Sequence, residues 1–279
     1  MKELSLAWLL KRHLEHLRTG IRDVLPDPLA GKNAIFRNIH KGQRCFILGS
    51  GNSVSGQDLK RLKGEIVMTQ NHFHVHPDIA TINPTYHVNV PKYQPREYDQ
   101  DWSEWLNTMD QRLPKRTILF FDQNTKYLVD SMGLFAGRVY FTKSGYSEFV
   151  ARSAPVDLSR SIMSIPTVLT QCLAISIYMG FSEIYLVGFD LDQIYKMNDR
   201  TTVRFYGLSP ITANKFESDA ERNLGASGGD WLAMWRIWRQ CGLLKLEAER
   251  CGTNIYNATQ GGLLNVFERC AYEEISLGA

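Results

Sequence analysis

The sequence predicts an α/β fold built on a mostly parallel sheet, and three observations support this. Short apolar runs alternate with helix-compatible segments from Gln43 onward, which is the order of βαβ units. Two of these runs end in glycine, at Gly49 and Gly188, as parallel strands do where the chain turns beside a ligand. Residues 165–180 form an apolar segment that fits a buried helix. A Rossmann-like sheet is therefore expected.

The composition is that of an ordinary globular protein with one large domain or two small ones. The chain has 279 residues, 44% of them hydrophobic, and a net charge of +3, so nucleic acid is not an expected partner. Five widely spaced cysteines without a CxxC pair indicate neither a disulfide framework nor a metal site. No apolar run approaches the roughly 18 residues that span a bilayer, and no signal-peptide pattern opens the chain. We expect a cytoplasmic protein without a bound metal.

Residues 1–28 are expected to form a separate amphipathic N-terminal helix. Leucines and isoleucine recur at helical spacing among basic residues, and Pro26 ends the pattern. Such a helix can contact the inner face of a membrane through residues 2–25. It can also pack on its own domain or on a second copy of the chain. The sequence leaves open both the peripheral membrane contact and the homo-oligomer.

A glycine-containing loop follows the first predicted strand, Arg44–Leu48. Glycine lets backbone N–H groups approach an anion closely, and a following helix adds positive potential at its N-terminus. The loop matches neither the full GxGxxG pattern nor a Walker loop. It is interpreted as a nucleotide-binding loop, with a plain strand-to-helix turn as the alternative. Its residues are Gly49, Ser50, Gly51, Asn52 and Ser53.

Polar residues follow the second and third predicted strands, 65–69 and 86–90. The histidines of the segment Gln70–His76 suit a ligand-lining loop better than a metal site, because no carboxylate or cysteine completes a ligand set. Asn89 interrupts an apolar strand, so a position at the strand tip facing a ligand is expected, with a turn as the alternative. The aromatic residues of 92–116 are expected to pack in the core. Further strands are predicted at 117–121 and 138–141.

The second half of the chain repeats the strand-to-loop pattern. The predicted helix 165–180 leads into strand Ile184–Val187, which ends at Gly188 and Asp190. An acidic residue just past a parallel strand suits catalysis, a ribose hydroxyl or Mg²⁺, or it caps the next turn. The last predicted strand, 254–256, leads into a loop that lines a ligand or forms a tight turn. Its candidate binding residues are Asn257, Thr259 and Gly261.

The long polar stretch over about 193–229 is interpreted as a substrate lid, because unstructured loops of this length inside a domain are usually functional. Asp230 is expected to N-cap a final helix that runs to Arg250. Its tryptophans share one helical face and are expected to pack in the core. They are Trp231, Trp235 and Trp238.

Five of these segments, taken in order, resemble a bacterial superfamily. It groups the motility-accessory-factor flagellin glycosyltransferases, surface-glycan proteins and the archaeal 6-hydroxymethylpterin diphosphokinases. The domain is also similar to bacterial lipooligosaccharide sialyltransferases, which use a CMP-sugar. The resemblance covers about residues 40–275 and implies a sialyltransferase-like variant of the GT-A fold. The segments are Gly49–Ser53, Gln70–Asn71, Met179–Phe181, Ile184–Leu191 and Asn257–Gly262.

The resemblance implies roles for single residues. The loop Gly49–Ser53 would contact the nucleotide, and Asn71 and Asn89 would hold the donor. Thr167 keeps part of a Thr-Ser-Gly motif that precedes the buried helix in the sialyltransferases. Gly188 and Asp190 match a segment near the cytidine ribose.

One departure concerns the general base. The sialyltransferases use a lid histidine, but here the matching stretch reads Arg204-Phe205-Tyr206, and all seven histidines lie at or before His87. Asp190 and Arg204 are the catalytic candidates, with Arg204 placed to stabilise the phosphate of the leaving nucleotide. General-base candidates, besides Asp190, are Asp192, Glu217 and the histidines of 72–76.

The sequence thus predicts a glycosyltransferase with a nucleotide-sugar donor and no permanently bound cofactor. A sialic-acid-like sugar from a CMP donor is favoured, with a bacterial surface glycan or its lipid-linked precursor as acceptor. One alternative is a diphosphokinase-like enzyme that uses ATP and Mg²⁺. Another is a nucleotide-sugar-binding partner without catalytic activity.

Overall fold

The computed structural model describes residues 27–92, 95–145, 155–195, 203–207 and 219–277, and the side chains of all of these except 219–230. The predicted N-terminal amphipathic helix (2–25), with the membrane or subunit contact expected of it, and Glu217 lie outside the described residues.

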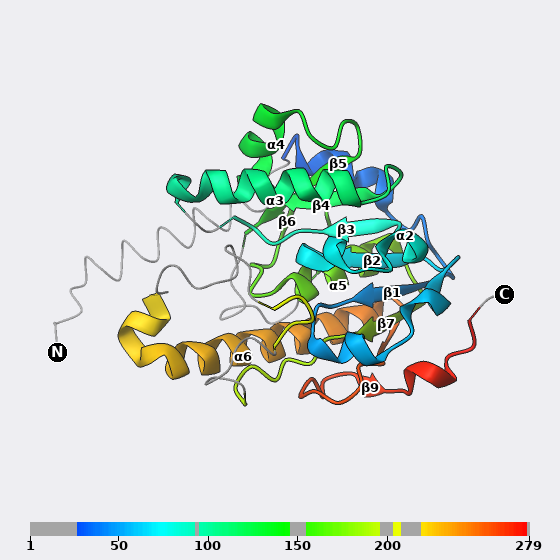
Figure 1. The fold of residues 1–279 in the computed structure, drawn as a ribbon. Helices are drawn as coiled ribbons and strands as arrows, with labels where there is room; N and C mark the ends of the chain where they lie inside the picture. Colours follow the sequence, from blue (N-terminus) through cyan, green and yellow to red (C-terminus); the bar gives the residue numbers. More distant parts are fainter. Residues whose placement is uncertain (1–26, 93–94, 146–154, 196–202, 208–218, 278–279) are drawn as a thin grey trace.

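A nine-stranded sheet forms the centre of the molecule, and every strand pairing in the described chain is parallel. The spatial order of the strands is β6-β5-β4-β3-β2-β1-β7-β8-β9, and the middle of this series is visible in Figure 1. All seven predicted strands are present, and the two-residue strands β6 and β9 are additional. The strands are β1 (Arg44–Leu48), β2 (Val67–Gln70), β3 (Tyr86–Val88), β4 (Ile118–Asp122), β5 (Val139–Ser144), β6 (Ser161–Ile162), β7 (Glu183–Val187), β8 (Asn254–Asn257) and β9 (Glu268–Arg269).

The strand order reverses once, between β1 and β7. From β1 the chain moves outward in one direction as far as β6, then returns and places β7 on the other side of β1. Loops that leave two neighbouring parallel strands in opposite directions open a crevice at the carboxyl edge of the sheet. The loops after Leu48 and Val187 therefore occupy the position where α/β proteins bind ligands.

The helices cover both faces of the sheet. The described α-helices are α2 (Ile79–Ile82), α3 (Asp99–Arg112), α4 (Lys126–Met132), α5 (Val168–Met179) and α6 (Asp219–Arg250). Short 3₁₀ segments are η1 (Ala30–Phe36), η2 (Asn52–Gly56), η3 (Leu59–Leu62), η4 (Asn71–Val75), η5 (Arg96–Tyr98), η6 (Gln123–Thr125) and η8 (Tyr272–Glu274). Figure 1 shows α3 and α6 on opposite sides of the molecule.

The sheet has a hydrophobic core on each of its faces, and the side chains of β1 alternate between the two. Cys45 and Ile47 pack with α5 and α6, whereas Phe46 and Leu48 pack with α2, α3 and α4. Successive strand residues point to opposite faces, so a strand covered on both sides is apolar throughout. Trp102 and Trp105 of α3 are 0% and 6% exposed, which confirms core packing for these two aromatic residues, whereas Tyr93 lies outside the described residues.

Residues before the predicted domain boundary at residue 40 belong to the packed unit. The side chain of Asn33 in η1 donates hydrogen bonds to the carbonyl oxygens of Phe141 and Leu158, at 2.8 and 2.9 Å. Phe36 joins the core formed by α5 and α6. The folded unit therefore extends ahead of residue 40.

Helix α6 corrects two expectations. It begins at Asp219, eleven residues before the predicted N-cap Asp230, so residues 219–229 of the predicted lid are helical, while residues 196–202 and 208–218 of the lid lie outside the described residues. The glycines at 225, 228 and 229 each cost the helix only about 1 kcal/mol relative to alanine, and the helix-forming residues around these glycines offset that cost. Core packing of the tryptophans is wrong for Trp231 and Trp235, which are 59% and 47% exposed. Trp238 is half-buried and donates a hydrogen bond to the side chain of Asn265.

Helix α5 agrees more closely with the sequence. It begins at Val168 after Thr167, and it ends at Gly180, which has a φ of 80°. Only glycine takes up this left-handed conformation without strain, as expected of a helix C-terminus. All twelve residues of α5 are buried, as the apolar segment predicted.

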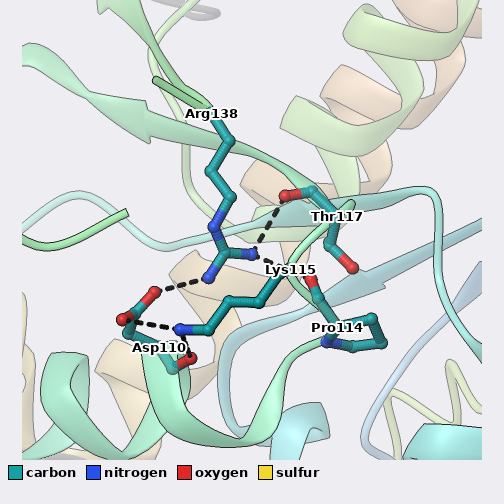
Figure 2. A network of polar contacts seen from close by, with 5 residues as sticks. All are labelled: Asp110, Pro114, Lys115, Thr117 and Arg138. Atoms are coloured by element: carbon teal, nitrogen blue, oxygen red, sulfur yellow. Dashed lines mark hydrogen bonds and ion pairs between the residues drawn. The ribbon is translucent and has the colours of Figure 1, made fainter. Parts of the chain in front are cut away.

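Arg138 ties the start of β5 to the end of α3. Its guanidinium donates to the carbonyl oxygens of Pro114 and Thr117, at 3.0 and 3.1 Å, and pairs with the carboxylate of Asp110 (Figure 2). Lys115 contacts the same carboxylate at 3.1 Å. This network lies at the amino end of β5, away from the carboxyl edge that forms the candidate site.

Over the part of the chain that the structure describes, no helix combines the length and the apolar character needed to cross a bilayer.

Candidate functional site

The loops that follow β1, β7 and β8 meet at Asp190. Its carboxylate accepts a hydrogen bond from the backbone N–H of Ser53 at 3.0 Å and a second from the Ser53 hydroxyl. Its backbone carbonyl accepts a hydrogen bond from the N–H of Leu263 at 2.7 Å. Asp190 is only 6% exposed. The loops that the sequence predicted at one sheet edge therefore do meet there. Asp190 connects them through its hydrogen bonds to Ser53 and Leu263.

The predicted reason for glycine at positions 49 and 51 is wrong. The N–H groups of Gly49 and Gly51 donate to the carbonyl oxygens of Val187 and Gly188, at 2.7 and 2.9 Å, so they are not available to an anion. A Cβ at Gly49 would lie 2.3 Å from the Gly188 oxygen, and one at Gly51 would lie 2.6 Å from the Asp190 carboxylate. Both residues are glycine because two loops pack backbone to backbone.

The chain after the glycine loop forms 3₁₀ turns and not an α-helix. Segments η2 and η3 have five and four residues, too short to supply the dipole of a long helix. The anion that this loop binds in the structure is the Asp190 carboxylate. Asn52 remains exposed at the rim.

Residues 203–207 lie against the glycine loop. Arg204 forms an isolated antiparallel bridge with Gly51, and the N–H of Phe205 donates to the carbonyl oxygen of Ser50 at 3.3 Å. The Arg204 guanidinium donates to the Tyr206 hydroxyl at 3.1 Å. The predicted catalytic candidate Arg204 therefore does reach the carboxyl edge of the sheet.

Tyr206 also belongs to a stack of three aromatic rings. It stacks on His72 with ring centroids 4.9 Å apart, and the His72 ring stacks on Trp105 at 4.5 Å and an interplanar angle of 15°. Burial, followed by the neighbouring His74 and Arg204, lowers the pKa of His72 to about 3. His72 is therefore a neutral ring held between two aromatic side chains.

His74 and His87 are also buried, and each has a hydrogen-bond partner at Nδ1. His74 Nδ1 lies 3.0 Å from the carbonyl oxygen of Asn71, and His87 Nδ1 lies 2.8 Å from the Thr69 hydroxyl. Burial, with a smaller effect of Arg112, lowers the pKa of His74 to about 4. Among the side chains that the structure describes, no group of three histidines, cysteines or carboxylates could hold a metal ion.

Asn71 and Asn89, the two asparagines expected to hold the donor, differ in their surroundings. Asn71 has a φ of 47°, and its side-chain oxygen accepts a hydrogen bond from the N–H of Val90 at 2.9 Å, which links the loops after β2 and β3. Asn89 follows β3 directly and is fully buried, yet neither polar atom of its side chain has a hydrogen-bond partner among the described residues. A buried amide left unpaired costs free energy. The hydrogen-bonding capacity of Asn89 is thus unused within the described part of the protein.

The remaining predicted binding residues mainly support the loops. The Thr259 hydroxyl accepts a hydrogen bond from the N–H of Phe189 at 3.0 Å, and the Asn257 side chain bonds within its own loop. The carbonyl oxygens of Thr259 and Gly261 both accept hydrogen bonds from Arg269.

Two further predicted residues take part in loop packing and in the first turn of a helix. Gly188 has a φ of 76°, and a Cβ there would lie 2.2 Å from Val54. The carbonyl oxygen of Thr167 accepts two hydrogen bonds from Thr170 in the first turn of α5.

The sequence pattern does not indicate that Trp105 and Tyr206 meet at His72. Core packing is the prediction for Trp105, and it is confirmed, while Tyr206 is predicted only as one of the basic and aromatic residues in the stretch interpreted as a lid. The spacing of aromatic residues in α3 could not indicate that Trp105 would meet His72, which lies on a 3₁₀ segment in a different unit of the chain.

The fold is that of known glycosyltransferase structures, which confirms the predicted fold class. A MAf glycosyltransferase from Magnetospirillum magneticum AMB-1 matches with a TM-score of 0.52 and 15% sequence identity, over 98% of this chain and 43% of that protein. This chain therefore spans less than half the length of that protein.

Two structures of the sialyltransferase CstII from Campylobacter jejuni also align. The complex with cytidine-5'-monophosphate has a TM-score of 0.46 and 14% identity, over 85% of this chain and 88% of CstII. The complex with CMP-3FNeuAc has a TM-score of 0.43 and 15% identity, over 82% and 85% of the two chains. No protein-family model and no curated protein matches the sequence.

Proposed function

We propose that this protein is a glycosyltransferase that binds a nucleotide sugar in the crevice between the loops after β1 and β7. A CMP-linked, sialic-acid-like sugar is the favoured donor, and a surface glycan or its lipid-linked precursor is the favoured acceptor. The fold supports glycosyl transfer in general, because it is the fold of the MAf glycosyltransferase. The preference for CMP rests on the sequence motifs described above.

The observation that carries this proposal is the unpaired side chain of Asn89. It is fully buried at the carboxyl end of β3, with an oxygen and a nitrogen that find no partner within the described ranges of the chain. An amide presents both donors and acceptors, so it complements a group that presents the same, such as a nucleotide base or a sugar hydroxyl. A ligand that pairs with Asn89 recovers the cost of leaving it unpaired.

Arg204 supplies the positive charge beside the proposed phosphate. Its backbone pairs with Gly51, and its guanidinium is anchored by the Tyr206 hydroxyl at 3.1 Å. A guanidinium fits the paired oxygens of a phosphate and stabilises the charge that develops as a nucleotide leaves. Binding of the phosphate therefore relies on the Arg204 guanidinium more than on the backbone N–H groups of the glycine loop.

The proton acceptor is a separate question from the phosphate. His72 is a weak base, because burial first, and then His74 and Arg204, lower its pKa to about 3. The carboxylates of Asp190 and Asp192, at the end of β7, remain the proposed candidates. Asp190 already accepts two hydrogen bonds from Ser53, so part of its capacity to accept a proton from the substrate is occupied.

The experiment is a thermal-shift and calorimetric screen with CMP, UDP, GDP and ATP, each with and without Mg²⁺. We expect CMP to raise the Tm without metal in the wild type and to lose this effect in Asn89→Leu, which keeps the volume but removes the amide. Asn107→Ala, at an exposed position of α3, is the matched control and should keep the CMP response. Equal CMP responses in wild type and Asn89→Leu would overturn the site. A response to ATP with Mg²⁺ alone would favour the diphosphokinase alternative.

Turnover separates an enzyme from a non-catalytic binding partner. Incubation with CMP-N-acetylneuraminate should release CMP faster in the presence of a glycan acceptor than in its absence. Binding of CMP without any release of CMP from the donor would support the non-catalytic alternative.

A further inference from the structure

Two buried nitrogen atoms in the aromatic stack have no hydrogen-bond partner in the part of the chain that the structure describes. Trp105 is 6% exposed and His72 is 7% exposed, and Trp105 Nε1 and His72 Nδ1 are both unpaired. The two rings are stacked with centroids 4.5 Å apart. Buried polar atoms are nearly always paired in proteins, so two in one ring pair call for an explanation.

The chemistry of these atoms suits an anion. An indole N–H can only donate a hydrogen bond, and a neutral imidazole carries a proton on one of its two nitrogens. A cation, Arg204, is linked to the stack by the Tyr206 hydroxyl at 3.1 Å and by the ring contact between Tyr206 and His72. The indole N–H, the imidazole in its Nδ1–H tautomer and the guanidinium together match a carboxylate, which accepts several hydrogen bonds and has a delocalised negative charge.

We propose that Trp105 Nε1, His72 Nδ1 and Arg204 form a subsite for the carboxylate of a sugar acid. This inference rests on the proposed function and makes its substrate class more specific. In a CMP-linked sugar acid of the sialic-acid type, the carboxylate and the phosphate ester are substituents of the same carbon. A single guanidinium can therefore lie beside both groups, while Trp105 and His72 select the carboxylate.

The subsite accounts for the chemistry of the stack. A histidine between two aromatic rings supplies a donor without adding a charge that would repel Arg204. A positively charged His72 would oppose the guanidinium in a poorly solvated place. A neutral sugar leaves both nitrogens unpaired, so the subsite discriminates against donors without a carboxylate.

The test uses variants that keep an aromatic ring at each position and remove the nitrogens. At pH 7.5 the Tm of His72→Phe should stay close to that of the wild type, whereas Trp105→Phe, which loses one ring of the buried indole, should lower the Tm without preventing folding. The probes are N-acetylneuraminate, its uncharged methyl ester and CMP, measured on the full chain by NMR and calorimetry. Addition of the acid, not the ester, should shift the indole N–H signal of Trp105, which the Trp105→Phe variant identifies.

The expected effect on affinity is specific to the acid. Each variant should bind N-acetylneuraminate about tenfold or more weakly, because a hydrogen bond to a charged group is worth roughly one to two tenfold steps in affinity. CMP binding should not change. A protein that binds CMP but treats the acid and the ester alike would overturn the subsite and leave the proposed function standing. If a water molecule pairs with the two nitrogens instead of a ligand, the acid and the ester will also be treated alike, and the subsite is overturned. Failure to bind CMP would overturn the proposed function itself.

Discussion

Ser53 and Asp190 are 137 residues apart in the sequence and are joined by two hydrogen bonds, one from the Ser53 backbone N–H at 3.0 Å and one from its hydroxyl. They lie in the loops after β1 and β7, where the strand order reverses. An open α/β sheet needs these loops to diverge so that a ligand can enter. The Ser53–Asp190 contact limits that divergence and fixes the floor of the crevice.

Removing the Ser53 hydroxyl should weaken this floor without destroying it. Ser53→Ala keeps the backbone hydrogen bond, so we expect the free energy of unfolding to fall by about 1.5–3 kcal/mol, the range for a hydrogen bond to a charged group. Urea unfolding measures the change. Asn52→Ala, one residue away at an exposed position, should change stability by no more than about 0.5 kcal/mol. Equal effects of the two substitutions would contradict this account.

Alanine should have opposite effects at two glycines. A Cβ at Gly49 would lie 2.3 Å from the carbonyl oxygen of Gly188, which is backbone and cannot move aside. Gly49→Ala should therefore cost about 3 kcal/mol or more, or prevent folding. At Gly242 in α6, no atom of the described chain lies within 4 Å of the position that a Cβ would take, and Gly242→Ala should stabilise the helix by about 0.5–1 kcal/mol. Chemical denaturation of both variants measures whether the free energy of unfolding falls in Gly49→Ala and rises in Gly242→Ala.

The sheet was predictable because its strands are short apolar runs that end in polar or glycine residues. Cys45–Leu48 and Ile184–Val187 carry this pattern in a few consecutive residues, and the pairing of β1 with β7 brings them together. The placement of Asn89 at a strand tip was predictable for the same reason, since an asparagine in an apolar run indicates a strand end.

The chemistry within the loops was not predictable from local pattern. Glycine at positions 49 and 51 is compatible with an anion site and with close backbone packing, and only the contact with Gly188 distinguishes them. The start of α6 was missed because glycines near residue 227 indicated a loop, whereas the helix continues through them. The stack of Trp105, His72 and Tyr206 depends on three separate segments, so no spacing in the sequence encodes it.

Asp110 should contribute stability that depends on pH. Burial raises the pKa of Asp110, but the hydrogen bonds and charges of Arg138 and Lys115 outweigh burial and lower it below its ordinary value of 3.8. A carboxyl whose pKa is lower in the folded state stabilises the fold above its unfolded pKa and loses this effect as the pH falls through the folded value. At pH 7, Asp110→Asn should cost about 1–3 kcal/mol.

The difference between wild type and Asp110→Asn should shrink as the pH falls below about 4. Unfolding curves at a series of pH values measure it. Asp130→Asn is the control, because its partner Lys126 is on the surface and the two side chains are 55% and 39% exposed. Such a pair contributes at most about 1 kcal/mol. A constant difference between pH 7 and pH 3 would contradict the role of Asp110.

His72 should also lower stability as the pH falls, but over a higher pH range than Asp110. Its pKa is about 3 in the folded protein, mainly because of burial, compared with 6.5 as an ordinary value. Below pH 6.5 the unfolded chain binds a proton that the folded chain does not, so stability falls by up to about 1.4 kcal/mol per pH unit. His72→Phe removes this contribution. As the pH falls from 7.5 to 5, the free energy of unfolding of the variant should rise by about 2 kcal/mol relative to that of the wild type. A difference between the two proteins that stays constant with pH would contradict this.

Arg204 should govern the rate of transfer, because the N–H groups of Gly49 and Gly51 are occupied by Val187 and Gly188 and cannot stabilise the leaving phosphate. Arg204→Met should lower kcat by about 10²-fold or more, the usual effect of removing a donor to a developing negative charge. Arg204→Lys keeps the charge but lacks the planar fork, so an intermediate loss is expected.

Tyr206→Phe extends this test, because it frees the guanidinium that the hydroxyl holds at 3.1 Å while the ring stays on His72. Its loss of kcat should be smaller than that of Arg204→Met, with an unchanged Tm. The measurement is CMP release from CMP-N-acetylneuraminate at saturating acceptor. Arg160→Met, at a side chain that is 55% exposed, is the control. If Arg204→Met kept kcat within about threefold of the wild type, well short of the loss expected for a phosphate donor, the leaving group would be stabilised elsewhere.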